Sequence, residues 1–362
     1  MRSLAPRTMT ASKRRQEIMT PELIVRGAAE FSRYGLFLLR SGGSMTSLRN
    51  MAEDRQTTER VAAVLRAAAD AGNTLDPDWA SQLTAHADLA TAFLESLRSV
   101  GAFDRLLPDM VAIPARTNAA VVVASGAASQ VEEGKAIPVR EFALAGSKLI
   151  EYRSAAILVI TDELVRTASP LGLRLLQTEL RYAVAQSTDA IFLTTLLAAI
   201  TPGVSAGASA ANLASDLRTL LLAVAPKARS RLAWLMDATT ATEISTKVDT
   251  AGAPLHPTMG ATGGELLGLP ALVTDAMPRD SDGGVLMLVD AQRIGADAGI
   301  VTMDSSSEAL VQMDTAPAEP TAAATVMTSL FQRNLKALRA QRTFGFEVVR
   351  ANAVAALTAV NY

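Results

Sequence analysis

One serine in the sequence has the spacing that nucleophilic hydrolases use. Gly203-Val204-Ser205-Ala206-Gly207 matches the G-x-S-x-G pattern, and Asp237 or Asp249 followed by His256 gives the chain order of one class of these enzymes. The pattern requires a strand before the serine and a helix directly after it. Here the motif follows a long predicted helix and lies in a linker of small residues. A serine hydrolase using Ser205 is therefore only a remote alternative.

Other residue types that could carry chemistry are sparse. The chain has no cysteine, and of its two histidines His86 lies in an amphipathic helical pattern, whereas His256 is held between an apolar residue and a proline. The glycines at 260–264 lack the Gly-Lys-Ser/Thr ending of a phosphate loop. Glu132 and Glu133 are adjacent on a predicted strand, so their side chains point to opposite faces. We expect no enzyme activity, no metal and no cofactor.

Charge is unevenly distributed along the chain. Residues 1–66 carry 12 Lys and Arg against 6 Asp and Glu, or +6, and the remainder carries 22 against 30, or −8. The basic start indicates either an arm that contacts nucleic acid or an acidic partner, or a solvated helical face. The negative body argues against a dedicated DNA-binding protein, because phosphate neutralisation dominates that affinity.

The composition is apolar for a chain of 362 residues, with 49% hydrophobic and 19% charged residues. Either an Ala-rich core or apolar surface buried between subunits accounts for it. The longest apolar helical stretch, 191–200, is roughly half of the ~20 residues that a membrane span needs. The basic start lacks the apolar core of a secretory signal. We therefore expect an intracellularly made, soluble protein without membrane contact.

Helical periodicity recurs in several segments. It predicts helices at 51–70 and 76–100, a short helix from Thr161 to Ser169, and the longest helix at about 171–200, which would span ~45 Å. Two further helices are expected at 212–225 and, capped by Asp237, up to Lys247.

Extended structure begins near Met110. Pro114 and Pro138 disfavour helix and Val121-Val122-Val123 favours strand, so residues 113–142 read as two strands joined by a long tip. Such a hairpin has no dense apolar face and needs a neighbour to lie on. Further strands are predicted at 149–160, 232–236, 271–274, 285–289, 300–303, 309–313 and, closing the fold, 344–349, with 330–340 left ambiguous.

Several short motifs occur in an order that is typical of one protein family. They are Val131-Glu132-Glu133-Gly134-Lys135-Ala136-Ile137-Pro138, the helix at 171–200, Trp234-Leu235-Met236-Asp237, Gly264-Glu265-Leu266-Leu267-Gly268-Leu269-Pro270, Met277-Pro278, and Ala337-Leu338-Arg339 with Phe344-Gly345-Phe346. Over about residues 100–357 this order resembles the tailed-phage major capsid proteins of the Hong Kong 97-type fold.

The resemblance implies an α+β fold with an axial domain, a peripheral domain, a long spine helix, an extended β-hairpin called the E-loop, and an N-terminal arm. The implied division is a basic helical, scaffold-like segment at 1–75, the arm at 76–112, the E-loop hairpin at 113–145, the peripheral domain at 146–235 with its spine helix at 171–200, a mainly axial domain at 236–325, and a C-terminal return at 326–362. In this family the N-terminal segment is in some cases a scaffold that a protease removes.

The implied function is that of a shell subunit that self-assembles into pentamers and hexamers, forming the icosahedral head of a tailed double-stranded DNA phage or prophage. We expect the hairpin to lie across an adjacent subunit, with Glu132, Glu133, Lys135 and Arg140 in the contact, and the stretch at about 88–112 to extend along another subunit for want of a core of its own. The implied location is the virion capsid, assembled in the bacterial host cytoplasm.

The implied partners are further copies of the chain, packaged DNA held on the inner face by charge only, and portal, scaffold or decoration proteins. The alternative within the same fold is an encapsulin-like compartment shell, which packages proteins instead of DNA.

Overall fold

The computed structural model describes residues 93–94, 96–98, 100–114, 119–124, 143–147, 149–167, 170–249, 251–314, 317, 319 and 325–362. The chain divides into two compact units, Met1–Ser96 and Leu97–Tyr362. In the first unit the Ser96 hydroxyl donates to the Phe93 carbonyl at 2.6 Å. The predicted helix at 51–70, most of that at 76–100, and His86 lie outside the described residues. The remaining description concerns the second unit.

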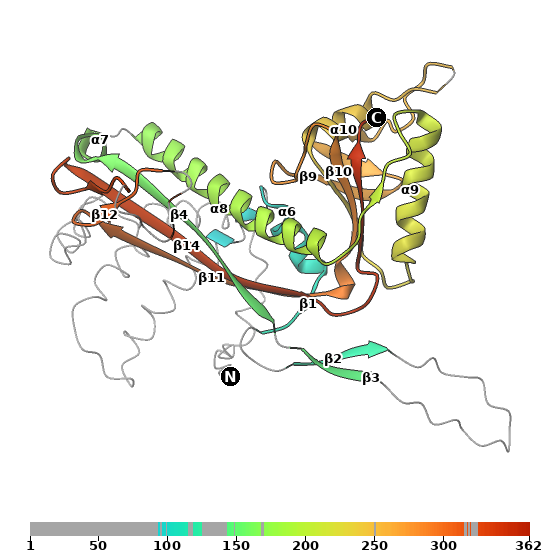
Figure 1. Ribbon diagram of the computed structural model, residues 1–362, viewed down its shortest axis with the longest axis horizontal. Coiled ribbons are helices and arrows are strands. Elements are labelled where there is room, and N and C mark those ends of the chain that lie inside the picture. Colours follow the sequence, from blue (N-terminus) through green and yellow to red (C-terminus); the bar gives the residue numbers. More distant parts are fainter. Residues whose placement is uncertain are drawn as a thin grey trace, which may run out of the picture. The chain divides into compact units, whose positions relative to one another are not determined.

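A seven-stranded sheet, in the order β5-β15-β10-β6-β9-β8-β7, forms one layer of the second unit (Figure 1). Both faces of its central strands are covered, so that every residue of β10 is buried. Trp234 and Met236 belong to a core cluster with the helices α9 and α10, whereas Ala233 and Leu235 belong to a separate cluster with α6 and α8. The strands are β5 (Gly203–Val204), β6 (Leu232–Met236), β7 (Met259–Gly260), β8 (Gly263–Leu266), β9 (Leu269–Val273), β10 (Gly284–Asp290) and β15 (Val354–Val360).

The two helices on this sheet begin at side-chain caps. In α9 (Ala210–Val224) the Ser209 hydroxyl accepts from the Asn212 amide, and in α10 (Ala238–Ser245) the Asp237 carboxylate accepts from the amides of Thr239 and Thr240. The cap predicted at Asp237 is confirmed. The helix predicted from Asn212 begins two residues earlier, because Ser209 is the cap.

A four-stranded sheet has the order β1-β11-β14-β4. Its strands are β1 (Val111–Ala112), β4 (Ile150–Thr161), β11 (Ile294–Ser306) and β14 (Leu335–Val348), with the helix α7 (Asp162–Thr167) directly after β4. The long helix α8 (Pro170–Ala198) packs along β4 and β14 (Figure 1), which confirms the long helix expected at about 171–200.

The strand predictions differ most from the structure near the C-terminus. The closing strand expected at 344–349 is the end of the 14-residue strand β14, which also contains most of the ambiguous stretch 330–340. Its inward row is Ala340, Arg342, Phe344 and Phe346, so a buried arginine interrupts the apolar alternation that would have marked the strand. The last strand is β15, which was not predicted because small residues dominate it.

The predicted hairpin is described only at its base. Here β2 (Ala119–Ala124) pairs antiparallel with β3 (Ala143–Ser147), so the described part of the returning strand lies past the expected boundary at 142. Among the described strands these two pair only with each other. A second small pair joins β12 (Leu310–Val311) to β13 (Thr328–Ser329).

The segment before the hairpin packs into the core of its own chain. It forms the short helix α6 (Ala102–Leu106), the 3₁₀ turn η2 (Leu107–Asp109) and β1, which pairs parallel with β11. Phe103 is fully buried, with ring centroids 5.2 Å from Phe192 and 5.3 Å from Phe344. The expectation that this stretch lacks a core of its own is therefore wrong for residues 100–112.

Candidate assembly surfaces

The four-stranded sheet has a groove on the face opposite α8. It has a volume of about 1070 Å³. Its floor comes from the outward residues of β4, β14 and β11, and its wall from the segment around β12. The residues that line this groove are Ala155, Ala156, Ile157, Val159, Asp304, Ser305, Ser306, Ala309, Leu310, Val311, Gln312, Met313, Asp314, Pro317, Met327, Ala337 and Arg339.

Strand alternation explains why this face is open. In β14 the inward residues Arg342, Phe344 and Phe346 meet α8 and α6, whereas the outward residues Arg339 and Gln341 do not. No helix covers the outward row in the described part of the chain. Half-exposed apolar side chains therefore line the groove: Ile157 is 54% exposed, Leu310 63% and Met313 56%. Clustered apolar exposure of this kind is typical of a contact surface.

Charges inside the groove are paired across the sheet. Arg339 lies opposite Ile157 of β4 and Asp304 of β11, and its Nη2 is 2.6 Å from Asp304 Oδ2. Both side chains are more than half exposed, so their ion pair contributes at most about 1 kcal/mol to folding. An incoming charged segment can therefore exchange partners with this pair at little cost.

The hairpin residues predicted to contact a neighbour, Glu132, Glu133, Lys135 and Arg140, lie outside the described residues. The described base, β2 and β3, has a register shift between Val122 and Ala124. The groove residues were missed at the sequence level. The alternation Ala155-Ile157-Val159 in β4 was the available signal. No local pattern predicts which face of the sheet α8 covers.

A buried ion pair holds the segment that leads to the hairpin. Asp104 of α6 and Arg342 of β14 form a two-pronged contact, with Arg342 Nη1 at 2.8 Å from Asp104 Oδ2 and Nη2 at 2.7 Å from Oδ1. Arg342 is fully buried, and its guanidinium carbon lies 5.4 Å from the ring centroids of both Phe103 and Phe344. The pair thus holds α6 against β14, and β2 begins 13 residues after α6 ends at Leu106.

A second buried carboxylate caps the same helix. Asp189 of α8 accepts from the amides of Ala102 at 2.8 Å and Phe103 at 2.9 Å, and from the Thr274 hydroxyl at 2.9 Å. Burial raises the pKa of Asp189 above its ordinary value, and the charge of Asp104 adds to this, while the three hydrogen bonds oppose it. The two carboxylates together bind α6 to α8, to β14 and to the residue that follows β9.

The residues of the hydrolase alternative bond to separate partners. The Ser205 hydroxyl donates to Asp216 at 2.6 Å, and Asp237 caps α10. Asp249 accepts from the amides of Ala251 and Ala253 within its own turn. Burial lowers the pKa of His256. The helix after Ser205 begins only at residue 210, so the motif is not a nucleophile elbow.

Ser205 instead helps to close the end of the chain. Asp216 is buried and accepts from Ser205, from the Ala206 amide at 3.1 Å, and from the Tyr362 hydroxyl at 2.9 Å. Burial and the adjacent Asp216 carboxylate raise the pKa of Tyr362 above its ordinary value. The G-x-S-x-G sequence thus ties the linker and the last strand to α9.

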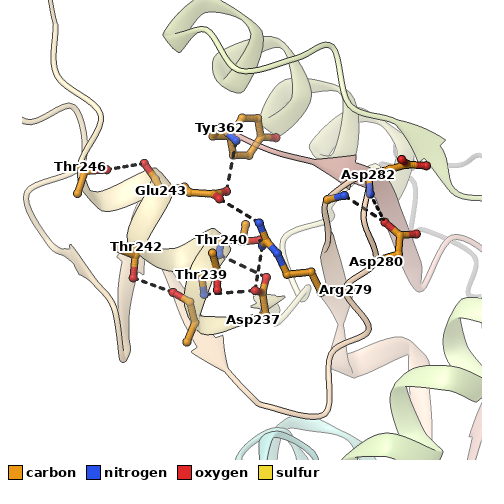
Figure 2. A network of polar contacts seen from close by, with 12 residues as sticks. Asp237, Thr239, Thr240, Thr242, Glu243, Thr246, Arg279, Asp280, Asp282 and Tyr362 are labelled. Atoms are coloured by element: carbon orange, nitrogen blue, oxygen red, sulfur yellow. Dashed lines mark hydrogen bonds and ion pairs between the residues drawn. The ribbon is translucent and has the colours of Figure 1, made fainter.

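A second polar network holds α10 (Figure 2). Arg279 lies between Asp237 and Glu243, with its two terminal nitrogens each 3.0 Å from a carboxylate oxygen. The other Glu243 oxygen accepts from the Tyr362 amide at 3.3 Å. This network joins the cap of α10, the loop before β10 and the end of β15, and it reads as structural because every charge has a partner within it.

The described residues hold neither a metal-ligand cluster nor a membrane-spanning helix. No group of three or more His, Cys, Asp or Glu is arranged there to hold a metal ion. No described helix has the length and apolar character to cross a membrane.

Comparisons with known proteins agree on one family. The model of the phage capsid family matches residues 82–359. The capsid polyprotein of Pseudomonas phage PAJU2 is 34% identical over 319 residues, which cover 83% of this chain and 48% of that relative. The chain thus spans about half the length of the curated relative it matches.

Solved structures from phages are also similar. A chain from Mycobacterium phage Bobi has a TM-score of 0.47 at 16% identity and covers 70% of this chain and 89% of its own. A chain from Gordonia phage Cozz has a TM-score of 0.49 at 15% identity, with coverages of 71% and 86%. A chain from the capsid of an empty GTA particle has a TM-score of 0.44 at 16% identity, with coverages of 73% and 89%.

Proposed function

Because this chain belongs to the phage capsid family, and is therefore a structural rather than a catalytic protein, we propose that its copies assemble as pentamers and hexamers into the icosahedral head of a tailed double-stranded DNA phage or prophage. The observation that carries this proposal is the pairing of two features in one chain. A hairpin base pairs with no other described strand, and an apolar groove is left open on a sheet of the same unit.

The hairpin of one copy occupies the groove of an adjacent copy. The tip sequence suits this site, because Val131, Ala136 and Ile137 provide apolar contacts for an apolar groove. The tip charges suit it as well. One of the two acids Glu132 and Glu133 can pair with Arg339, and Lys135 can pair with Asp304, both of which line the groove. Such a contact is heterologous, and heterologous contacts close into rings when their rotation permits.

The strength of one such contact is modest. Full burial of a large apolar side chain contributes about 1.5–3 kcal/mol, and the groove residues Ile157, Leu310, Met313 and Met327 are already about half buried. Covering the exposed half of these side chains contributes roughly 3–6 kcal/mol. The cost of association reduces this gain, so one isolated contact should have a dissociation constant in the millimolar range or weaker. A closed shell engages many such contacts together, and multivalency then stabilises the whole.

The structure of each lobe supports an assignment of domains within this proposal. The seven-stranded sheet with α9 and α10 is taken as the axial domain, and the four-stranded sheet with α8 as the peripheral domain. Each sheet draws its strands from separate parts of the chain. The strands of the seven-stranded sheet lie within 203–290 and at 354–360, and those of the four-stranded sheet lie at 111–112, 150–161, 294–306 and 335–348. These assignments replace the continuous boundaries 146–235 and 236–325. Residues 1–75 remain the proposed scaffold-like segment.

Packaged DNA on the inner face, and portal, scaffold or decoration proteins, are the further partners of this proposal. Assembly in the cytoplasm of a bacterial host belongs to it as well. The compartment-shell and hydrolase alternatives are not favoured, since the curated relative is a phage capsid polyprotein.

Two residues on the same face of the sheet provide a matched test. Ile157 lies in the groove and Ile300 lies outside it, and they are 54% and 68% exposed. We expect Ile157→Glu to leave a folded subunit that forms no closed particles by electron microscopy, because a buried carboxylate opposes docking. Ile300→Glu should form normal particles. Deleting residues 118–135 should also abolish closed particles, and normal shells from that deletion or from Ile157→Glu would refute the docking.

A further inference from the structure

Exposed cations gather at one end of the seven-stranded sheet. The loop from Ala225 to Arg231 joins α9 to β6 and carries Lys227, Arg229 and Arg231, all of them exposed. The turn between β14 and β15 brings Arg350 to the same place, since the Arg350 amide donates to the Arg293 carbonyl at 3.2 Å. We call Lys227, Arg229, Arg231 and Arg350 the basic cluster.

A buried arginine braces the two loops that carry the cluster. Arg293 is 7% exposed, and its guanidinium donates to the Val224 carbonyl at 2.6 Å, to Ala225 at 2.8 Å and to Asn352 at 2.8 Å. One residue therefore fixes the end of α9 and the β14–β15 turn against each other. Because its donors are consumed by carbonyl oxygens, Arg293 acts as a brace and not as a contact for a ligand.

The backbone of the loop is fixed as well. The Ser230 hydroxyl donates to Asp290 at 2.6 Å, the Arg231 amide donates to the same carboxylate at 2.9 Å, and the Lys227 amide donates to the Ser230 hydroxyl at 2.9 Å. Asp290 is in turn paired with Arg293 at 2.9 Å and is 1% exposed. Asp290 is thus an internal acid that holds the backbone of the loop, and the long cationic side chains of the loop are exposed.

Among the described residues, little negative charge opposes the loop cations Lys227, Arg229 and Arg231. Arg231 Nε lies 3.9 Å from Asp109, with both side chains more than half exposed, so this contact is weak. In the described part of the chain neither Lys227 nor Arg229 forms an ion pair. The chain after residue 66 carries a net charge of −8, so a local surplus of cations here stands against the overall sign.

We propose that the basic cluster contacts the phosphate backbone of double-stranded DNA enclosed by the shell. The inference rests on the proposed function, which places DNA inside the particle. Phosphate contacts need exposed Lys and Arg on a fixed backbone and no base-reading geometry, which is what the braced turn provides. An acidic surface of a second copy is the competing occupant, and the experiment below distinguishes it.

The test uses the full chain and a short DNA duplex of mixed sequence. Lys227→Gln, Arg229→Gln and Arg231→Gln are combined in one variant, and the control combines Arg153→Gln, Arg218→Gln and Arg333→Gln, three exposed arginines elsewhere. Both variants lose three charges and keep the basic segment 1–66, so a background contribution from that segment cancels. Binding is measured by fluorescence anisotropy across a range of salt concentrations.

The expected result is a change in salt dependence. Each lost phosphate contact reduces the slope of log K against log salt by about 0.9, so the cluster variant should lose roughly two to three units of slope and bind on the order of 10²-fold more weakly at 0.1 M salt. The control should keep the slope of the unaltered chain. Equal slopes for the two variants would overturn the proposal.

Particle formation is scored separately by electron microscopy. Normal particles from the cluster variant, together with the reduced slope, support a DNA contact. Loss of particles with an unchanged slope assigns the cluster to a contact between copies and overturns the inference. If the unaltered chain forms no particles, the proposed function fails, whereas the slope comparison still decides whether this cluster binds DNA.

Discussion

Removing the carboxylate of Asp104 should destabilise the second unit severely. The change leaves the Arg342 guanidinium fully buried without its counter-charge, and breaking a buried pair in this way costs about 3–5 kcal/mol. The contact of Arg342 with Phe103 and Phe344 remains and limits the loss at the lower end of that range. Since whole domains are stable by only about 5–15 kcal/mol, Asp104→Ala should remove a large share of the free energy of unfolding.

Urea unfolding followed by tryptophan fluorescence measures this loss. The chain has two tryptophans, and a Trp79→Phe background leaves the buried Trp234 as the reporter for the second unit. The matched control is Asp304→Ala, which breaks the exposed ion pair between Asp304 and Arg339. Arg339 lies on β14, as Arg342 does, and losing this exposed pair should cost at most about 1 kcal/mol. Measurements are made on dilute, unassembled chain, so that assembly does not contribute to the midpoint.

A paired replacement tests the electrostatic explanation itself. Asp104→Leu combined with Arg342→Met removes both charges and keeps apolar volume, and it should recover most of the stability lost in Asp104→Ala. A loss below about 1 kcal/mol in Asp104→Ala, or a double variant as unstable as the single one, would refute the reasoning. Because α6 leads into the hairpin, Asp104→Ala should also lower the yield of closed particles.

The remaining predictions concern Asp189 and Ser205. Since the pKa of Asp189 is raised above 3.8, its folded form binds more protons than its unfolded form between the two pKa values. The quantity to measure is the free energy of unfolding of the unaltered chain minus that of Asp189→Asn, obtained from urea titrations at several pH values. This difference should rise as pH falls through the window, and a flat or falling difference would contradict the prediction. Ser205→Ala should lose about 1 kcal/mol with the bond to Asp216 and still assemble. Labelling of Ser205 by an active-site serine probe would contradict its structural role.

Local patterns in the sequence determined most of the helices. The α8 helix, the strand β6 and the Asp237 cap of α10 follow from periodicity, apolar runs and capping chemistry, which act over a few residues. The same patterns placed the hairpin and excluded the hydrolase reading through the setting of Ser205. The family resemblance was likewise a property of motif order along the chain.

What only the tertiary structure decided depends on partners that are distant in sequence. Asp104 and Arg342 are 238 residues apart, so no local pattern around either residue predicts their buried ion pair. The segment around α6 was therefore predicted to be an arm without a core of its own. The groove lies on the face opposite the one where α8 packs on β4 and β14, and no described helix covers it. The basic cluster likewise depends on Arg293, which joins two loops that are distant in sequence. Periodicity tells which residues share a face of an element, but burial depends on what packs against that face, and only the folded chain specifies it.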